Sequence, residues 1–489
     1  MSTDRRHRLE ASIPPLASSI DGRRFTFQCS LHGLELQAGG YVELGGVRLG
    51  QVHTLEHAWV DAGTIDGDDA TGMTGIRVGI GQGEGVVLDG EPTPFHDDEL
   101  RPATGAEVAD WLERARPDRA TLDVGELALV PSVRHRLDAG GFDRHTFFCG
   151  QSGSGKSYAL GTVLERLLLE STIRVVVLDP NSDFVRVAEP REGIDADVAA
   201  RYAKAAEGVE VRSAGERGAD RLHVRFTDLD PAEQAAVLRL DPIRDRDEYS
   251  ALVEAVEHSS AMPEGATGVK NALATSEDSR LRALGTRIGN LGIDRWRIWS
   301  VGDPDSLQEL VAPGGPRCLV VDIGSLTSPE EQAVAAESVL GTLWRRRTER
   351  VPTLVVVDEA HNVCPREPDD EVRALATEHA VRFAAEGRKF GLYLLVSTQR
   401  PQRVHDLVVS QCDNLVLMRM NAPSDLAYIA ETLSFAPRPL LERSLSFGLG
   451  ESLVAGKISS HPAIVRFGPR LAREGGTDVP TTWAARTDA

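Results

Sequence analysis

The stretch Gly150–Ser157 constrains this chain more than any other, because it reads GQSGSGKS and fits the pattern G-x-x-x-x-G-K-[ST]. It stands between a short apolar run, Thr146–Cys149, and a helical pattern, Tyr158–Glu170. Glycines in such a turn let backbone N–H groups surround a phosphate, and the N-terminus of the helix adds partial positive charge. The chain has only five lysines among 489 residues, so a chance match that includes Lys156 is rare. The pattern favours a phosphate-binding loop over a plain glycine turn.

The residues of this loop have distinct expected roles. Lys156 is expected to reach the β- and γ-phosphates of a nucleotide, and Ser157 to ligate Mg²⁺. The residues predicted to hold the nucleotide are Gly150, Gln151, Ser152, Gly153, Ser154, Gly155, Lys156, Ser157 and Tyr158.

Short apolar runs that are typical of buried strands alternate with helical patterns along the rest of the chain. The expected strands are Thr146–Cys149, Ile173–Leu178, Cys318–Ile323, Thr353–Val357, Leu392–Ser397 and a sixth at Leu415–Met420. The intervening helices include Tyr158–Glu170 and Pro329–Arg347. Strands rich in valine and leucine that alternate with amphipathic helices predict a parallel sheet covered on both faces, and so the α/β class.

The remaining segments differ in character. In the first hundred residues, short apolar stretches alternate with glycine-rich turns, which predicts a small β-barrel. Alanine, arginine and glutamate dominate a long interruption of the α/β rhythm and predict helices, either as a solvated cap or as a binding element. The expected organisation is 1–102 β-barrel, 103–143 a helix and irregular connector, 144–184 and 316–470 α/β core, 185–315 mostly helical insertion, and 471–489 flexible tail.

Charge limits what the chain can bind. The net charge is -20, so the protein as a whole repels nucleic acid, and any contact with DNA must come from a local basic feature such as a pore or groove. Residues 1–100 hold sixteen acidic residues against seven basic ones. The barrel is therefore a poor candidate for gripping phosphates, and we expect it to contact protein.

No apolar run approaches the roughly 18 residues of a membrane span, and the N-terminus lacks the apolar stretch of a secretory signal. These features predict a cytoplasmic protein without a membrane contact. The five cysteines lie far apart with no C-x-x-C pair, which argues against a zinc site or a disulfide framework and predicts core thiols.

Polar residues follow two of the expected strands. Asp358 and Glu359 end the run Leu354–Val357, where Asp358 is placed to hold the water shell of Mg²⁺ and Glu359 to polarise an attacking water. Gln399 follows the strand Leu392–Ser397 and is placed to contact the γ-phosphate or the lytic water. The alternatives are an ordinary loop start for the two acids and a loop-stabilising amide for Gln399.

Together these residues point to ATP hydrolysis. No N-K-x-D guanine-reading motif is present, which disfavours a GTPase, and no second helicase-type core follows the first. A glutamate next to the magnesium-binding aspartate favours water as the nucleophile over a hydroxyl group of a substrate.

A series of motifs resembles the HerA-type ATPases, which are hexameric DNA translocases related to FtsK, and the resemblance covers most of the chain. The motifs are the phosphate loop, Leu178-Asp179-Pro180, Val357-Asp358-Glu359-Ala360-His361-Asn362, Glu386-Gly387-Arg388-Lys389-Phe390-Gly391, Ser397-Thr398-Gln399-Arg400-Pro401, Ser410-Gln411-Cys412 and Arg144-His145. The resemblance implies a RecA-like P-loop core with a helical insertion and a small N-terminal β-barrel.

The resemblance also implies roles for three further residues. Arg388 would be an arginine finger that reaches the nucleotide of a neighbouring subunit, and Arg144 a second residue acting across the interface; the alternative for both is a surface position, with Arg388 in an ion pair. Asp179 would belong to the nucleotide site. The family usually has His-Gly-Glu-Tyr after the aspartate and proline, whereas Asn181–Phe184 reads NSDF, and an acidic role for Asp183 does not carry over.

By the same resemblance, the chain would be a homohexamer that binds ATP and Mg²⁺ and threads double-stranded DNA through its ring channel. A separate nuclease or effector subunit would dock on the barrel, in DNA end processing or in anti-phage defence, because the chain has no nuclease motif of its own. The alternative is a ring scaffold that assembles and regulates an effector without processive translocation. A secretion or conjugation pump is disfavoured by the missing membrane anchor.

Overall fold

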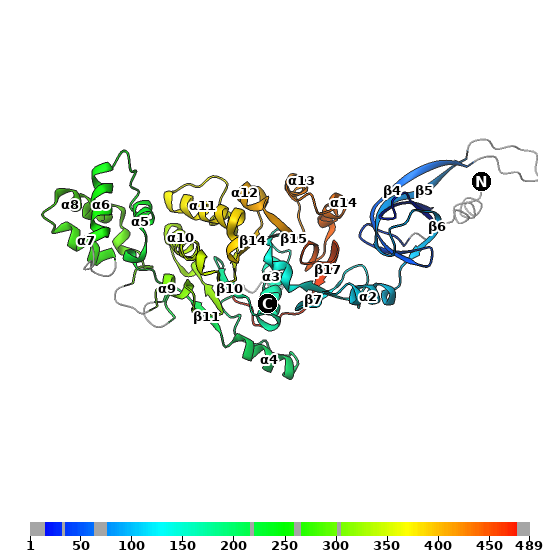
Figure 1. Ribbon diagram of the computed structural model, residues 1–489, viewed down its shortest axis with the longest axis horizontal. Coiled ribbons are helices and arrows are strands. Elements are labelled where there is room, and N and C mark those ends of the chain that lie inside the picture. Colours follow the sequence, from blue (N-terminus) through cyan, green and yellow to red (C-terminus); the bar gives the residue numbers. More distant parts are fainter. Residues whose placement is uncertain are drawn as a thin grey trace, which may run out of the picture. The chain divides into compact units, whose positions relative to one another are not determined.

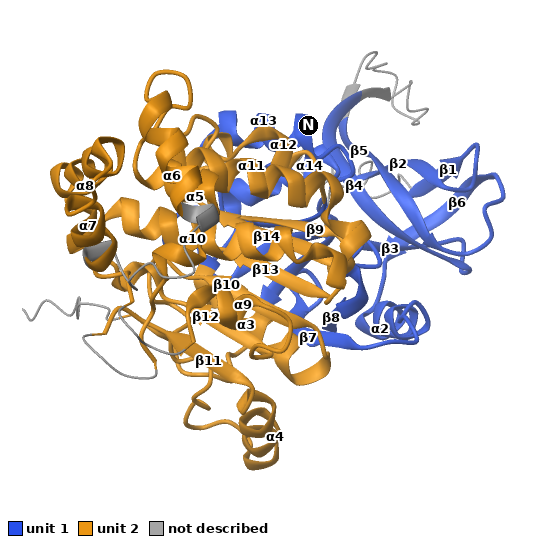
Figure 2. Ribbon diagram, turned by 60° about the vertical axis from the view of Figure 1, so that its left-hand side comes forward, with its two compact units in different colours: residues 1–141, 150–156, 413–468 blue, residues 142–149, 157–412, 469–489 orange. Residues whose placement is uncertain are grey.

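The computed structural model describes residues 15–31, 35–62, 76–215, 220–258, 266–300 and 305–476. The chain forms two compact units, which Figure 2 colours separately. Unit 1 consists of residues 1–141, 150–156 and 413–468, and unit 2 of residues 142–149, 157–412 and 469–489. The chain alternates between the units, so neither is continuous in sequence.

The N-terminal part of unit 1 is a closed six-stranded barrel in the order β1-β2-β5-β4-β3-β6, which confirms the predicted barrel (Figure 1). Its strands are β1 (Leu16–Ser19), β2 (Arg24–Ser30), β3 (Tyr41–Leu44), β4 (Arg48–Ala62), β5 (Ile76–Asp89) and β6 (Phe95–Pro102). In β2, the buried residues Phe25, Phe27 and Cys29 alternate with exposed ones. This period of two places every second side chain in the barrel core.

The other strands of unit 1 are antiparallel and run in the order β15-β16-β17-β7-β8. They are β7 (Thr121–Leu127), β8 (Arg134–Asp138), β15 (Cys412–Met418), β16 (Glu451–Gly456) and β17 (Ala463–Phe467). One expectation was wrong here: the chain after the connector helix is a paired hairpin, β7 and β8, and not irregular. The sixth expected strand is present as β15, and it pairs antiparallel with β16.

Unit 1 also contains α2 (Gly105–Arg114), α13 (Pro423–Thr432) and α14 (Arg438–Glu442). The start of α2 is set by a capping box, in which the Thr104 side chain accepts from the Glu107 amide and the Glu107 side chain accepts from the Thr104 amide. Two contacts tie the barrel to the β16–β17 loop: the buried Tyr41 hydroxyl lies 2.6 Å from His461 Nε2, and Gln51 Nε2 donates to the Pro462 carbonyl. Burial lowers the pKa of His461 well below its usual value, so the ring stays neutral.

Unit 2 is built on a parallel sheet in the order β11-β12-β10-β13-β14-β9, as predicted for the α/β class. The strands are β9 (His145–Cys149), β10 (Arg174–Leu178), β11 (Val209–Arg212), β12 (Cys318–Val321), β13 (Thr353–Val357) and β14 (Leu392–Thr398). Every residue of β9, β10, β12 and β13 is buried. Such strands belong to a sheet covered on both faces.

Helices cover this sheet and also occur along the segment inserted after β10 (Figure 1). They are α3 (Lys156–Glu170), α4 (Ala196–Ala206), α5 (Pro231–Val237), α6 (Arg246–His258), α7 (Ala266–Ala274), α8 (Ser279–Leu291), α9 (Leu307–Val311), α10 (Pro329–Arg345), α11 (Glu371–Glu386) and α12 (Asp406–Val409). The inserted segment also contains β11, which pairs with β12 at the edge of the sheet. A four-residue edge strand carries too little periodicity to be recognised in an alanine-rich segment.

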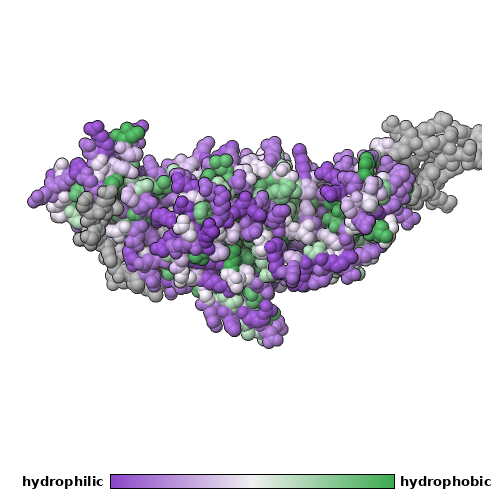
Figure 3. Space-filling model, in the orientation of Figure 1, coloured by the Kyte–Doolittle hydropathy of each residue, from purple (hydrophilic) through white to green (hydrophobic). Residues whose placement is uncertain are grey.

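All five cysteine side chains are buried, as expected for core thiols. Among the described residues, none of the helices has the length and apolar character needed to cross a membrane. The face drawn in Figure 3 is largely hydrophilic, with small scattered hydrophobic spots.

A buried ion pair joins α3 to the C-terminal segment of unit 2. Glu165 and Arg470 are both buried, and Glu165 accepts from Arg470 Nε and from the Leu471 amide. Gly161 makes this possible, because a Cβ there would lie 2.3 Å from the Arg470 guanidinium carbon. Beyond Arg470, the Gly475 amide donates to the Asp183 carbonyl. The rest of the expected flexible tail, residues 477–489, lies outside the described residues.

We predict that Arg470→Leu destabilises the protein by about 3–5 kcal/mol, because it leaves the Glu165 carboxylate buried without its partner. Thermal and urea unfolding would measure the loss. The control is Arg473→Ala, which removes half-exposed ion pairs to Glu189 and Glu192 and should change stability little. Equal effects of the two variants would contradict the assigned role of the buried pair.

Candidate active site

The phosphate loop has a backbone that its glycines make possible. Gly153 and Gly155 have φ values of +74° and +92°, in the left-handed region that favours glycine. A Cβ on Gly150 would lie 2.7 Å from the Cβ of Met418, so this position also requires glycine. Within unit 1, the Gln151 amide donates to the Arg419 carbonyl and Arg419 Nη2 donates to the Gly153 carbonyl, at 3.0 and 3.3 Å. The loop is therefore held in shape by the end of β15.

These residues fit the phosphates of a nucleotide. Lys156 begins α3 and is only 6% exposed, and a buried ammonium requires compensating negative charge. Ser157 and Tyr158 follow in the first turn of α3 and are partly exposed. The Tyr158 hydroxyl accepts from the Arg470 amide at 3.1 Å, which secures the C-terminal segment on this helix. Ser152 is exposed and Ser154 is buried, and the Ser154 amide donates to the Gln151 carbonyl.

The parallel register of unit 2 brings the other predicted residues to one edge. The paired residues are Leu178 with Val357, Val357 with Val396, and Thr398 with Cys149. Asp179, Asp358 and Gln399 follow the carboxyl ends of neighbouring strands, and the phosphate loop starts at Gly150 directly after the fourth strand end. Carboxyl ends of parallel strands are where α/β proteins bind ligands.

Asp358 and Glu359 are both buried, but they are held differently. Asp358 Oδ1 accepts from Ser397 Oγ at 2.7 Å, which fixes its carboxylate at the end of β13. Glu359 has φ 43° and ψ 50°, a left-handed conformation that is rare for a residue with a Cβ. Gln399 Nε2 donates to Glu359 Oε1 at 3.0 Å. The amide predicted to sense the γ-phosphate thus contacts the glutamate predicted to activate water.

His361 joins this group, and sequence reasoning gave it no role. Its Nδ1 lies 3.3 Å from Glu359 Oε2 and 3.1 Å from Thr398 Oγ1. Glu359 is therefore contacted on both carboxylate oxygens, by Gln399 and by His361. The sequence shows His361 two residues after the glutamate, but only the turn Ala360–Asn362 brings its ring back to the carboxylate.

Asp179 has a structural task beside its predicted nucleotide contact. Its carboxylate accepts from the amides of Asn181, Asp183 and Phe184 and closes the turn after β10. Burial raises the pKa of Asp179 to about 7, against the opposing effect of the amides. The nearby Asp183 and Asp358 raise it further.

Arg388 and Arg144 lie elsewhere. Arg388 is in the short turn after α11 and precedes β14, and Arg144 precedes β9. Both are partly exposed, and Arg144 Nε lies 3.5 Å from Asp143 Oδ1. They stand at the amino ends of strands whose carboxyl ends carry the predicted nucleotide-site residues, about 15–20 Å away along the sheet. Within a single chain, both arginines therefore stand at the opposite end of the strands from Asp358.

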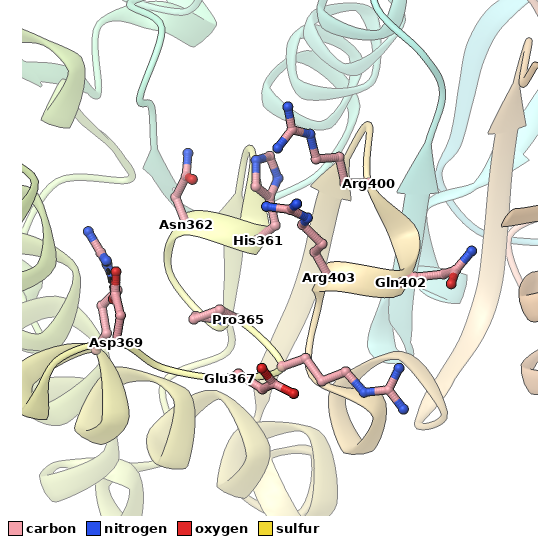
Figure 4. A pocket seen from close by; sticks show the side chains of 10 residues that line it. His361, Asn362, Pro365, Glu367, Asp369, Arg400, Gln402 and Arg403 are labelled. Atoms are coloured by element: carbon pink, nitrogen blue, oxygen red, sulfur yellow. Dashed lines mark hydrogen bonds and ion pairs between the residues drawn. The ribbon is translucent and has the colours of Figure 1, made fainter. Parts of the chain in front are cut away.

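A cavity of about 610 Å³ adjoins His361, which contacts Glu359, and is lined by the loops that follow β13 and β14 and by the start of α11 (Figure 4). Its lining residues are His361, Asn362, Pro365, Arg366, Glu367, Asp369, Arg373, Arg400, Gln402 and Arg403. Figure 4 shows Arg400 and Arg403 extending toward His361. Both are exposed, and in the described part of the chain neither guanidinium has an ion-pair partner, whereas Arg366 pairs with Asp406. Their positive charge is available to an anion.

The chain is similar to known proteins along much of its length. The family described as the central domain of the helicase HerA matches residues 122–283. The DNA double-strand break repair helicase HerA of Pyrococcus furiosus is 25% identical over 404 residues, which cover 71% of this chain and 69% of that protein. The HerA of Sulfurisphaera tokodaii is 29% identical over 167 residues, a third of each chain. The structure of VirB4 of Thermoanaerobacter pseudethanolicus aligns over 72% of this chain and 97% of that one, with a TM-score of 0.49 and 16% identity.

These similarities and the phosphate loop support a HerA-type P-loop ATPase. This confirms the resemblance and the reaction class predicted from the motifs, while the individual roles of the site residues remain predictions.

We predict that Glu359→Gln binds ATP but lowers the hydrolysis rate at least about 100-fold, because an amide keeps the shape of the side chain and cannot accept a proton. Equilibrium ATP binding and steady-state phosphate release would measure the two properties separately. The control is Glu349→Gln. This exposed glutamate precedes the amino end of β13, whereas Glu359 follows its carboxyl end. Loss of binding together with hydrolysis would make Glu359 a structural residue.

Proposed function

We propose that this HerA-type ATPase is a hexameric motor that couples ATP hydrolysis to the movement of double-stranded DNA for a separate nuclease or effector. The observation that carries the proposal is the arginine-lined cavity that adjoins His361. Because the net charge is -20, DNA needs a local basic site, and this one adjoins the residues that contact the catalytic glutamate.

The chemistry at the carboxyl edge follows from the side chains. Lys156 stabilises the charge on the β- and γ-phosphates, and Ser157 and Asp358 would hold Mg²⁺, which when bound neutralises further phosphate charge. Glu359 accepts a proton from the water that attacks the γ-phosphorus as the bond to the β-phosphate oxygen breaks. Gln399 and His361 fix the orientation of its carboxylate. Asp179 supports the site through the turn after β10.

The positions of Arg388 and Arg144 support the proposal that the chain assembles into a ring. Each arginine stands at the amino end of a strand, away from the carboxylates of its own subunit. In a ring, this edge can face the nucleotide of the neighbouring subunit, where an arginine stabilises the charge of the transition state. We take Arg388 as the principal residue acting across the interface, because its short turn ends at Gly391 in a left-handed conformation and projects from the end of α11. A homohexamer is the assembly expected for this type of ATPase.

The barrel supports a protein partner. Its surplus of acidic residues disfavours DNA binding. It is a closed barrel whose residues all precede the catalytic motifs. The named relatives are DNA double-strand break repair helicases. We therefore place a nuclease or effector subunit on the barrel and double-stranded DNA in the ring channel, in DNA end processing or in anti-phage defence.

The arginine cavity provides the test. We predict that Arg400→Ala combined with Arg403→Ala weakens binding to duplex DNA and makes the slope of log K against log salt shallower by about 1 for each phosphate contact that is lost. Fluorescence anisotropy with labelled duplex at several salt concentrations measures both quantities. The control is Arg346→Ala, an exposed arginine that precedes the amino end of β13. Unchanged affinity and slope in the double variant would contradict DNA binding at this cavity.

A further inference from the structure

Leu449 is a solvent-exposed apolar side chain next to the phosphate loop. It lies in the turn Gly448–Gly450, between the buried Phe447 and the start of β16, and is 72% exposed. Single exposed leucines are common on protein surfaces and need no explanation by themselves. The rigidity and the surroundings of this turn distinguish Leu449.

The turn is fixed on both sides of Leu449. The Gly448 amide donates to Glu451 Oε2 at 2.8 Å, and Arg466 Nη2 donates to Glu451 Oε1 at 2.7 Å. Gly450 has a φ of +74°, and its carbonyl accepts from the Phe467 amide at 3.0 Å. The exposed position of Leu449 therefore results from a defined backbone and not from a loose loop.

The same turn touches the phosphate loop, and both belong to unit 1. The Gly450 amide donates to the Ser154 carbonyl at 3.1 Å. A Cβ placed on Gly155 would lie 3.5 Å from Leu449 Cδ1, which is van der Waals distance. Leu449 thus stands directly beside the backbone that is shaped to hold phosphates, with most of its surface open.

We propose that Leu449 forms an apolar wall for the base and ribose of the nucleotide whose phosphates the loop holds. The loop and Lys156 account for the phosphates, and the base is the part of a nucleotide with large apolar faces. A leucine that is already fixed in place covers such a face without loss of backbone freedom on binding. This inference rests on the ATP site and is independent of the proposed action on DNA.

The contact has a specific energetic signature. An apolar wall contributes only to ligands that carry a base, so truncating it should leave a bare polyphosphate unaffected. Removing three carbons of a partly covered leucine should weaken binding by roughly 3- to 10-fold. Leu449→Met, which conserves the apolar volume, should bind like the parent.

The experiment uses calorimetric titration with MgATP and with magnesium tripolyphosphate, in the Glu359→Gln background so that ATP persists. We expect Leu449→Ala to raise the dissociation constant for MgATP by roughly 3- to 10-fold, with that for tripolyphosphate unchanged and with Leu449→Met restoring the parent value. The control is Val47→Ala in the turn between β3 and β4, which is also 72% exposed and should change neither constant.

Two results would overturn the inference. Equal weakening of both ligands would show that Leu449 supports the fold of the loop, and unchanged binding of both would show that it faces something other than the base, such as a neighbouring subunit. Thermal unfolding of the apo protein separates a folding defect from a binding defect. Failure of both the unsubstituted chain and the Glu359→Gln parent to bind either ligand would instead reject the ATP site itself.

Discussion

The parallel register of β10, β13, β14 and β9 is the constraint on which the rest of the site depends. It sets Asp179, Asp358, Gln399 and the start of the phosphate loop at the ends of four adjacent strands. Side chains alternate between the faces of a strand, so a slip of one residue would turn Ser397 away from Asp358 and separate Gln399 from Glu359. The fully buried valine and leucine residues of these strands make such a slip costly, so the hydrophobic core secures the geometry of the predicted site.

Buried acids gather at this edge of unit 2. Asp358 and Glu359 are buried. Burial raises the pKa of Asp179 to about 7. In the phosphate loop, Lys156 is also buried. Concentrated carboxyl groups of this kind favour a bound cation and disfavour anions unless arginines or lysines approach. The exposed Arg400 and Arg403 line a cavity together with His361, which contacts Glu359, so their positive charge is available to an anion next to the buried acids.

Much of this could be predicted from the sequence. The phosphate loop, the strand carrying Asp358 and the strand before Gln399 have strong local patterns, and the bounds of the parallel strands were predicted to within about two residues. The β7–β8 hairpin, the antiparallel pairing of β15 and the edge strand β11 were missed, because they depend on partners distant in the chain. The contact of His361 with Glu359 was missed for a similar reason, since it requires a left-handed backbone at a glutamate, which no residue type signals.

The central claim is that hydrolysis at this site moves DNA, and displacement of a third strand from a DNA triplex tests it most directly. The purified chain, with its partner subunit added where one is identified, is mixed with a duplex that carries a labelled triplex-forming strand, and release is followed with ATP. The account predicts release that requires hydrolysable ATP and is lost in Glu359→Gln. ATP hydrolysis stimulated by DNA without release of the third strand would contradict translocation and favour a ring that assembles an effector.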